Sequence, residues 1–505
     1  MNTPSWISRN VSRLFTGLQK GSWSVPNADD AGALDRAGTA DKASRTAGGS
    51  EPQPTPERTT RERLAASLRV KGEAMSPRML RRVLHELRAI IDPQISEVEG
   101  GRRAKVLLDH YRRATAARRR DMWLLMSEMF TVDPDTVKTA QAKYALAVGT
   151  LDEAAAEVHY RRATVSPRRR LLQRFSVLPE GIRFLVDLRA EMQASLRKDK
   201  RLRALDVEME YMFSTWFDVG FLELRRISWD SPASLVEKLI KYEAVHDIRS
   251  WDDVKNRLDS DRRCYGFFHP RLPDEPLIFV EVALIDHMAD SITPLLDEKA
   301  APADLNKATT AIFYSISNTQ TGLRGVSFGD SLIKRVVETL SNEFPRLRHF
   351  ATLSPIPGLR AWLAVHAERM LALLPPKDLA ELGRVVGFEP PRPTHVLQAL
   401  EAREGLVSLD AKSPLRRWLL QCAAQYLARE LVDGKPLDPV ARFHLGNGAR
   451  VERLNWMGDP SAKGLKQSYG LMVNYLYDLK RLDRQRAQLA EGKISVSGNI
   501  EELLP

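Results

Sequence analysis

The segment from Ala311 to Gly358 places the strongest constraint on the fold, because it reads as strand, glycine loop, helix and strand in succession. Ala311–Ile316 is rich in β-branched and aromatic residues, and a second strand is predicted at His349–Leu353. The loop glycines are Gly322, Gly325 and Gly329. A strand that leads through such a loop to a helix N-terminus can receive a phosphate on backbone N–H groups. The segment therefore predicts an α/β domain with an anion site.

The helix of this segment has one apolar face with the helical period, formed by Leu332, Ile333, Val336, Val337 and Leu340. The second strand is followed by Ser354-Pro355-Ile356-Pro357-Gly358, in which two prolines and a glycine impose a sharp turn. We expect this turn to present the hydroxyl of Ser354 close to the phosphate loop. A diphosphate site beside a presented side chain is typical of an enzyme.

Length and charge narrow the class of protein. The chain has 505 residues, 43% of them hydrophobic, which is enough for two or more packed domains. The formal net charge of +11 suggests an anionic partner: nucleic acid, a membrane surface or a polyanion such as coenzyme A. Arginine runs at 117–120 and 167–170 are typical of solvated helix faces. Basic and aromatic residues do not alternate regularly, so we expect no nucleic-acid partner.

Cysteine content and hydropathy bear on location. Cys264 and Cys422 are the only cysteines and form no CxxC pair, which argues against disulfides or a zinc site and fits a reducing compartment. No uncharged apolar run approaches the roughly 20 residues of a membrane span. The first 28 residues contain no acidic side chain, a weak similarity to mitochondrial transit peptides. We expect a cytoplasmic, bacterial-type protein, with the mitochondrial matrix as the alternative.

The chain divides into three predicted regions. Residues from about 26 to 60 contain almost no large apolar side chain, and residues 1–60 are predicted to be a disordered N-terminal segment. Residues 61–172 read as a helical domain, in which Ser76-Pro77 is a good N-cap and first-turn pair. Residues 173–505 are assigned to a mixed α/β catalytic domain.

Further elements are predicted within the third region. Strands are expected at Cys264–Phe268 and Leu277–Ile285, and a helix at Pro414–Val432. Pro439–Trp456 is predicted as a turn-and-strand segment, and a long helix from about Ala462 is predicted to close the chain.

Two resemblances carry the functional prediction. Arg324-Gly325-Val326-Ser327-Phe328-Gly329 resembles the R-G-x-G-x-G loop that holds the coenzyme A pyrophosphate in the N-acetyltransferase (GNAT) superfamily, with Ser327 in place of the middle glycine. Longer blocks resemble the malonyl-CoA decarboxylase family, in the order of that family and over about 175–479. They are HPRLPDEPLIFVEVALID (269–286), FYSISNTQTGLRGVSFGDSLIKRVV (313–337), LSPIPG (353–358), FHLGNGA (443–449) and LNWMGD (454–459).

The family resemblance implies a fold and an activity. The implied fold is a helical bundle followed by an acetyltransferase-like α/β domain. The implied reaction converts malonyl-CoA to acetyl-CoA and carbon dioxide without a metal or organic cofactor. Members of the family form homo-oligomers, typically tetramers.

By resemblance, three residues match active-site positions. Ser354 of LSPIPG matches the serine that engages the malonyl group, and His444 of FHLGNGA matches the histidine that protonates C2. Tyr477 falls where the family has a tyrosine that orients the histidine or the substrate. Taken without the family, these residues read as a strand-end serine, a turn histidine and a core aromatic on a helix.

Coenzyme A is assigned to the glycine loop and the strand before it. The diphosphate is predicted to bind at Arg324, Gly325, Val326, Ser327, Phe328, Gly329 and Asp330. The pantetheine path is predicted along Asn318, Thr319 and Gln320. Ser327 stands where some members of the family carry an acidic residue. The basic Arg450, Arg453 and Lys463 are candidates for attracting the adenosine phosphates.

Decarboxylation of malonyl-CoA requires side chains that stabilise negative charge and a side chain that donates a proton. Loss of carbon dioxide leaves a thioester enolate, whose charge hydrogen-bond donors can stabilise. C2 then needs a proton, for which a histidine with a pKa near neutrality is the expected donor. The main alternative is a coenzyme A-dependent acyltransferase, which needs an acceptor. A basic nucleic-acid-binding or scaffold protein would instead bind nucleic acid in a salt-sensitive way.

Overall fold

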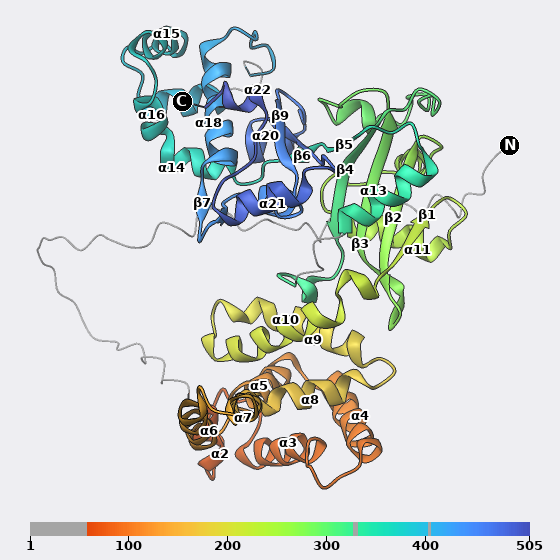
Figure 1. Ribbon diagram of the computed structural model, residues 1–505, viewed down its shortest axis with the longest axis vertical. Helices are drawn as coiled ribbons and strands as arrows, with labels where there is room; N and C mark the ends of the chain where they lie inside the picture. Colours follow the sequence, from red (N-terminus) through yellow and green to blue (C-terminus); the bar gives the residue numbers. More distant parts are fainter. Residues whose placement is uncertain (1–57, 327–331, 402–405, 505) are drawn as a thin grey trace, which may run out of the picture.

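A computed structural model describes residues 58–326, 332–401 and 406–504. The predicted disorder of residues 1–60 falls almost entirely outside these ranges. The first part of the described chain is helical and lies below the sheet in Figure 1. Its helices are α2 (Thr60–Ala65), α3 (Pro77–Ile90), α4 (Glu97–Arg113), α5 (Ala116–Glu128), α6 (Pro134–Ala147), α7 (Glu153–Ala163), α8 (Pro167–Ser176), α9 (Gly181–Leu196) and α10 (Arg203–Trp216). Residue 172 lies within α8, and the helices continue to Trp216.

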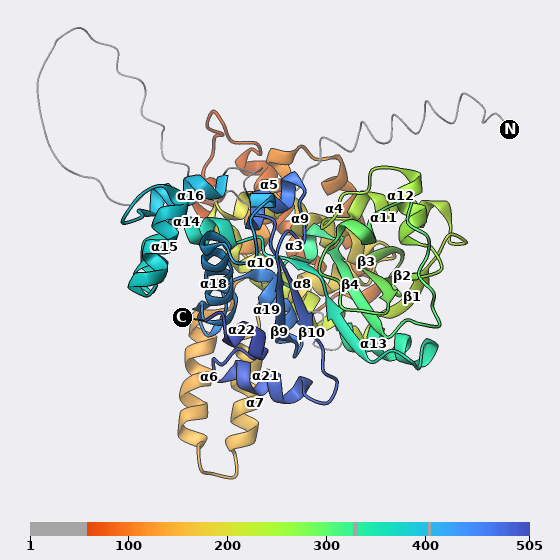
Figure 2. The same cartoon turned by 90° about the horizontal axis from the view of Figure 1, so that it is seen from above.

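The local signals of this helical part are confirmed. Ser76 caps α3 by accepting a hydrogen bond from the backbone N–H of Met79, with Pro77 in the first turn. The helix buries one apolar face, formed by Leu80, Val83, Leu84, Leu87 and Ile90. In contrast, α6 and α7 form an antiparallel hairpin that projects from the body of the molecule (Figure 2).

A mixed sheet forms the centre of the second part. Its strands are β1 (Glu223–Ile227), β2 (Arg262–His269), β3 (Leu272–Ile285), β4 (Thr310–Asn318), β5 (His349–Thr352), β6 (Ser354–Pro355), β9 (Arg450–Asn455) and β10 (Met472–Leu476). The order is β1-β2-β3-β4-β5-β10-β6, and β9 pairs with β10. Neighbours are antiparallel except β4 and β5, which are parallel. The four predicted strands are confirmed, and β3 begins earlier than predicted.

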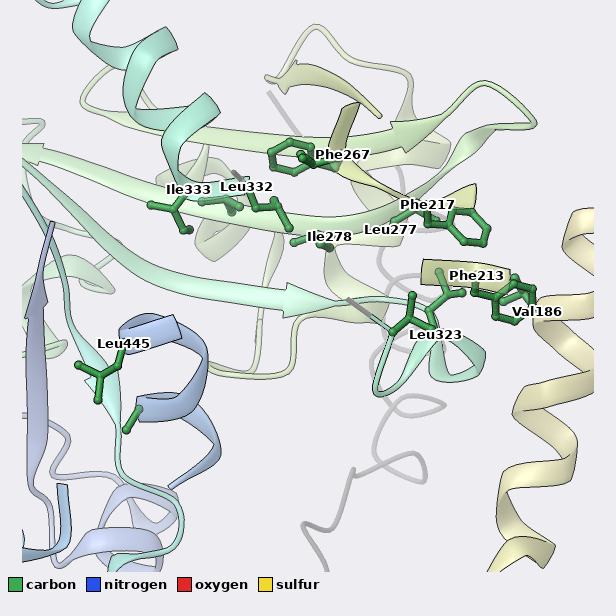
Figure 3. Packing of buried hydrophobic residues seen from close by; sticks show 14 of the residues in the cluster. Val186, Phe213, Phe217, Phe267, Leu277, Ile278, Leu323, Leu332, Ile333 and Leu445 are labelled. Carbon is green, nitrogen blue, oxygen red and sulfur yellow. The ribbon is translucent and has the colours of Figure 1, made fainter. Parts of the chain in front are cut away.

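The strand, loop, helix and strand unit is also confirmed. Helix α13 (Leu332–Glu343) connects β4 to its parallel neighbour β5, as a parallel pair requires. All five residues of the predicted apolar face of α13 are buried. Figure 3 shows Leu332 and Ile333 facing Phe267 of β2 and Ile278 of β3. The helix is thus held on the sheet by the face that the sequence predicts.

Helices α11 (Ala233–Tyr242) and α12 (Trp251–Arg257) cover the opposite face of the sheet. Val236 and Val254 of these helices pack with Cys264 of β2 and Phe279 of β3 in a separate apolar cluster. The sheet is therefore covered on both faces, which explains why β2 is buried along its whole length.

The C-terminal part corrects two predictions. Its remaining elements are α14 (Leu359–Ala372), α15 (Pro376–Val386), α16 (Pro393–Glu401), α18 (Pro414–Ala428), β7 (Leu431–Val432), β8 (Lys435–Pro436), α19 (Pro439–Gly446), α20 (Ala462–Ser468), α21 (Leu482–Ala490) and α22 (Gly498–Glu501). The segment predicted as turn and strand begins with helix α19, because Asp438 and Pro439 form an N-cap and first-turn pair like that of α3. The prediction of a long final helix is wrong, because left-handed backbone at Tyr469 and Gly470 ends α20 and strand β10 follows.

Candidate active site

His444 lies in the last turn of α19 and is buried, with 3% of its surface exposed. The helix starts at Asp438, whose carboxylate accepts hydrogen bonds from the N–H groups of Val440 and Ala441. The ring of His444 stacks on Tyr475 of β10, with centroids 4.7 Å apart and planes 25° apart. The imidazole is therefore held in position by its helix and by a neighbouring aromatic ring.

Ser354 is the first residue of β6, two positions after the end of β5, and is buried. Its hydroxyl donates to Oγ1 of Thr352 at 2.8 Å. The same Oγ of Ser354 lies 3.3 Å from Nε2 of His444. Residues separated by 90 positions in the sequence are thus in hydrogen-bond contact, as the predicted pairing of Ser354 with His444 requires.

Tyr477 follows β10, and its backbone N–H donates to the carbonyl of Phe350 on β5. The phenol oxygen lies 2.7 Å from Nδ1 of His444. The structure therefore brings the three predicted site residues, Ser354, His444 and Tyr477, into one chain of contacts. Tyr477 is placed by a strand end, and not by the helix that the sequence predicted there.

The hydrogen-bond partners define the direction of this chain. Among the described residues, the Tyr477 hydroxyl has no acceptor other than Nδ1 of His444. A buried hydroxyl without an acceptor is unfavourable, so Tyr477 donates to Nδ1 and the neutral ring carries its proton on Nε2. Nε2–H then points to Ser354, which donates in turn to Thr352. Each group therefore donates a hydrogen bond to the next in the order Tyr477, His444, Ser354, Thr352.

Burial controls the protonation of the site. It lowers the pKa of His444 to about 3, because the charged imidazolium is desolvated. Burial likewise raises the pKa of Tyr477 well above its ordinary value. The expectation of a histidine pKa near neutrality is therefore wrong for the unliganded protein. His444 is therefore neutral at physiological pH.

The described part of the predicted coenzyme A loop lies at the C-terminal end of β4. A short 3-10 turn, η5 (Thr321–Leu323), leads into Arg324 and Gly325, which are exposed, and then into Val326, which is buried. Gly325 has a positive φ of 81°, a conformation that favours glycine. Ser327, Phe328, Gly329 and Asp330 lie outside the described residues.

Helix α9 supports this loop from the helical domain. Arg189, 2% exposed, donates through Nη1 to the carbonyls of Gly322 and Arg324 at 2.8 and 2.9 Å. Gly322 has no room for a side chain, since a Cβ there would lie 1.9 Å from the carbonyl oxygen of Val186. Val186 and Leu323 are close neighbours in the apolar packing of Figure 3. The loop thus rests on α9.

The predicted pantetheine residues differ from one another in exposure. Asn318 is exposed at the end of β4, whereas Thr319 and Gln320 are buried. The side chains of Thr319 and Gln320 both donate to the carbonyl of Pro276. Their side chains therefore anchor the end of β4 to β3, and their contact with pantetheine stays a prediction.

The basic residues suggested for the adenosine phosphates have partners within the protein. Arg453 donates to Asn474 and to the carbonyl of Met288. Arg450 pairs with Glu452. Lys463 donates to the carbonyls of residues 244 and 245. These contacts account for all three side chains without a ligand.

The two parallel strands separate at the site. β4 pairs with β5 from Thr310 opposite His349 to Phe313 opposite Thr352. Beyond that point β4 continues to Asn318 with β3 as its partner, while β5 ends. The C-terminal half of β4 thus has an edge that β5 leaves unpaired, between the loop and Ser354.

Sequence reasoning missed three residues of the site: Thr352, Asp438 and Tyr475. Thr352 is a buried strand residue without a motif of its own. Asp438 was detectable, because an aspartate before a proline is a helix-start signal. Tyr475 was assigned to a helix, which hid its position on the strand beside His444.

The fold and the site define an enzyme of mixed α/β architecture with a helical N-terminal domain and a buried tyrosine–histidine–serine relay. The family model described as "Malonyl-CoA decarboxylase C-terminal domain" matches residues 220–505. The model described as "Malonyl-CoA decarboxylase N-terminal domain" matches residues 130–217. The chain belongs to the malonyl-CoA decarboxylase family, and the predicted helical domain followed by a mixed α/β domain is confirmed.

Individual relatives agree with this assignment. The mitochondrial malonyl-CoA decarboxylase of Anser anser anser is 35% identical over 434 residues, which cover 82% of this chain and 86% of the relative. The crystal structure of malonyl-CoA decarboxylase from Cupriavidus metallidurans is 43% identical, with a TM-score of 0.69 over 85% of this chain and 100% of that chain. The corresponding structure from Rhodopseudomonas palustris is 40% identical, with a TM-score of 0.72 over 84% and 99%.

None of the helices in the described ranges combines the length and apolar character needed to cross a membrane. Within the same ranges, histidine, cysteine and acidic side chains form no group of three or more that could hold a metal ion.

Proposed function

We propose that this protein decarboxylates malonyl-CoA to acetyl-CoA and carbon dioxide, with Ser354 engaging the malonyl group and His444 delivering a proton to C2. The observation that carries the assignment of residues is the buried relay from Tyr477 through His444 to Ser354. Family membership supports the reaction itself.

The reaction moves one electron pair and one proton. The bond between C2 and the carboxylate carbon breaks, carbon dioxide leaves as a neutral molecule, and the electron pair passes into the thioester as an enolate. The hydroxyl of Ser354 stabilises the charge on the substrate by turning from Thr352 toward it, which exchanges one hydrogen bond for another. C2 then takes the proton from Nε2 of His444, and acetyl-CoA is formed. Hydrogen bonds suffice for this charge, so we propose a reaction without a metal or organic cofactor.

Binding of the substrate changes the protonation state of His444 from neutral to charged. A malonyl carboxylate beside the ring favours the imidazolium form and raises the pKa that burial holds at about 3. The hydroxyl of Tyr477 donates to Nδ1 of the neutral ring and accepts from Nδ1–H of the charged ring. In the charged state the phenol proton has no acceptor among the described residues, so this state depends on the substrate carboxylate. His444 thus takes up a proton as substrate binds and gives that proton to C2.

Coenzyme A is proposed to bind along the loop and the free edge of β4. The diphosphate is assigned to residues 324–330, because backbone N–H groups of a loop that leads into a helix can receive a phosphate. The pantetheine arm is assigned to the path past residues 318–320. The edge of β4 that β5 leaves unpaired supports this route, since it connects the loop to Ser354.

A turnover measurement tests the proposed function. Pure protein is incubated with malonyl-CoA alone, and acetyl-CoA and carbon dioxide are measured together. Equal amounts of the two products without an acceptor are expected, whereas the acyltransferase alternative predicts turnover only when an acceptor is added. Mass spectrometry of the quenched enzyme should find no acyl group on Ser354, because its hydroxyl donates to Thr352 in the resting site.

A homo-oligomer, with a tetramer as the specific expectation, is proposed as the functional form. The hairpin of α6 and α7 supports this, since it projects from the body and exposes Leu146, Val148 and Leu151. Sedimentation velocity of the full chain measures the assembly directly, and a single monomer boundary at micromolar concentration would refute it.

A further inference from the structure

Asp438 occupies the start of the helix that carries His444. One carboxylate oxygen, Oδ1, accepts the backbone N–H groups of Val440 and Ala441 at 2.9 and 3.0 Å. Asp438 is completely buried, whereas N-cap residues on the surface of a protein remain in water. A buried carboxylate is unfavourable unless several donors bind it. Its other contacts therefore indicate what it holds in place.

The other contacts come from the segment of Ser354 and from a neighbouring helix. Gly358 ends the LSPIPG turn, four positions after Ser354, and its backbone lies against the Asp438 carboxylate, close enough that a Cβ there would be 3.6 Å from Oδ2. The hydroxyl of Tyr426 on α18 donates to Oδ2 at 3.3 Å. One buried carboxylate thus contacts both the turn that follows Ser354 and the helix that carries His444.

Packing at Gly358 shows how closely the turn lies against this bridge. A Cβ at Gly358 would lie 2.0 Å from the hydroxyl oxygen of Tyr426, and 3.6 Å from Oδ2 of Asp438. A contact under 3 Å cannot be accommodated without a shift. The glycine is therefore required for the close approach of its backbone to the Tyr426 hydroxyl, which in turn donates to the carboxylate.

The contact between Ser354 and His444 depends on other residues that hold the two segments in place. The two side chains meet at 3.3 Å, a long hydrogen bond between neutral groups. The imidazole stacks on Tyr475, and the charge of Asp438 adds to burial in raising the pKa of the Tyr475 phenol.

We propose that Asp438 is a positioning residue for decarboxylation, because its buried carboxylate sets the distance between Ser354 and His444 by capping the helix of His444 and packing against the backbone of the turn after Ser354. The inference rests on the proposed roles of Ser354 and His444. It predicts that loss of the Asp438 carboxylate lowers kcat, because Ser354 and His444 react with the malonyl end of the substrate. The affinity for coenzyme A should stay unchanged. A small misplacement of reacting groups lowers a rate by about 10²-fold in other enzymes.

The test compares Asp438→Ala with Asp438→Asn, which keeps an acceptor oxygen. Asp133→Ala is the matched control, since Asp133 caps α6 through N–H groups of residues 135 and 136 in the helical domain. For each variant, kcat, KM for malonyl-CoA, the melting temperature and the Kd of free coenzyme A are measured. We expect Asp438→Ala to lower kcat by about tenfold or more, with KM and Kd within about twofold of the parent protein. Asp438→Asn should recover most of kcat, and Asp133→Ala should change only the melting temperature.

A second pair of variants keeps the inference testable if Asp438→Ala does not fold. Gly358→Ala should lower kcat, because its Cβ meets the Tyr426 hydroxyl. Tyr426→Phe in the same chain removes that oxygen and should recover part of the loss, so the two effects are not additive. Additive effects, or an unchanged kcat in Gly358→Ala, would overturn the inference.

The outcomes separate this inference from the proposed function. If the parent protein does not turn over malonyl-CoA, the function fails. If the parent is active and Asp438→Ala has the same kcat per folded molecule, only the positioning role fails. A change confined to KM and the Kd of coenzyme A would also contradict it, since the carboxylate would then act on cofactor binding.

Discussion

The hydroxyl of Tyr477 lies 2.7 Å from Nδ1 of His444 and has no other hydrogen-bond partner among the described residues. This relationship fixes which nitrogen of the ring carries the proton in the neutral state, and therefore which nitrogen faces Ser354 as a donor. The arrangement differs from a nucleophilic serine–histidine pair, in which the histidine accepts the proton of the serine. It suits the delivery of a proton to substrate.

Replacing Tyr477 by phenylalanine should therefore slow the reaction. Without the phenol, Nδ1 loses its only hydrogen-bond donor among the described residues, and the ring is free to carry its proton on the wrong nitrogen. We expect Tyr477→Phe to lower kcat by roughly tenfold to 10²-fold with little change in KM. Steady-state kinetics measures both constants. Tyr144→Phe, in the α6–α7 hairpin, is the control, and equal losses in the two variants would contradict the relay.

Thr352 should control the direction of the Ser354 hydroxyl. It accepts from Ser354 at 2.8 Å and from the backbone N–H of Tyr475 at 3.1 Å. Thr352→Val keeps the shape of the side chain but removes the acceptor, so Ser354 is left to hydrogen-bond with His444 in the resting site. We expect kcat to fall by about tenfold. The same substitution leaves the Tyr475 N–H without this acceptor, so the melting temperature must be measured beside kcat. An unchanged kcat in Thr352→Val would show that the Ser354 hydroxyl is directed by other groups.

Arg189 should affect the binding of coenzyme A, although it belongs to the helical domain. It holds the carbonyls of Gly322 and Arg324 at the start of the proposed diphosphate loop. Lysine cannot bind two carbonyls and Asp206 in the same planar geometry. We expect Arg189→Lys to raise the Kd of coenzyme A by about tenfold, with a smaller change in kcat. Calorimetric titration measures this Kd. Arg174→Lys, at a buried arginine of α8 paired with Glu97, is the matched control, and an unchanged Kd in Arg189→Lys would refute the role.

Much of this site was predictable because its signals are local. The apolar face of α13 and the strand before it follow from side-chain periodicity, and the glycine loop between them follows from backbone requirements. The positions of Ser354 and His444 came from family motifs, while their contact depends on how β5 and α19 pack, which no local pattern encodes. Tyr477 was identified by motif but assigned to a helix, since Leu471–Leu476 contains apolar residues that suit either element. Thr352 escaped notice because its role exists only after β5 and β10 pair.

Buried histidines should make the folded protein less stable in acid. Burial lowers the pKa of His444 and of His246 to about 3. The unfolded chain therefore binds more protons than the folded chain between the ordinary histidine pKa of about 6.5 and about 3, and stability falls as pH falls through this window. Each group contributes up to about 1.4 kcal/mol per pH unit. Urea unfolding at several pH values measures the slope. His444→Asn should reduce it and His85→Asn, at an exposed position, should not; equal slopes in all three proteins would contradict the buried neutral state.

Proton uptake on ligand binding provides the sharpest test of how His444 works. The ring is neutral in the free protein, because burial disfavours the imidazolium. A carboxylate placed beside Nε2 reverses this preference, so a malonyl-CoA analogue that cannot react should bind together with about one proton near pH 7. Calorimetric titration in two buffers of different ionisation enthalpy measures the number of protons directly. The parent protein should take up close to one proton, and His444→Gln close to none. Acetyl-CoA, which lacks the carboxylate, is the matched ligand control and should bind without uptake. If the analogue binds tightly to the parent protein without proton uptake, the neutral imidazole donates the proton to C2, and Tyr477 must then replace the proton on the ring.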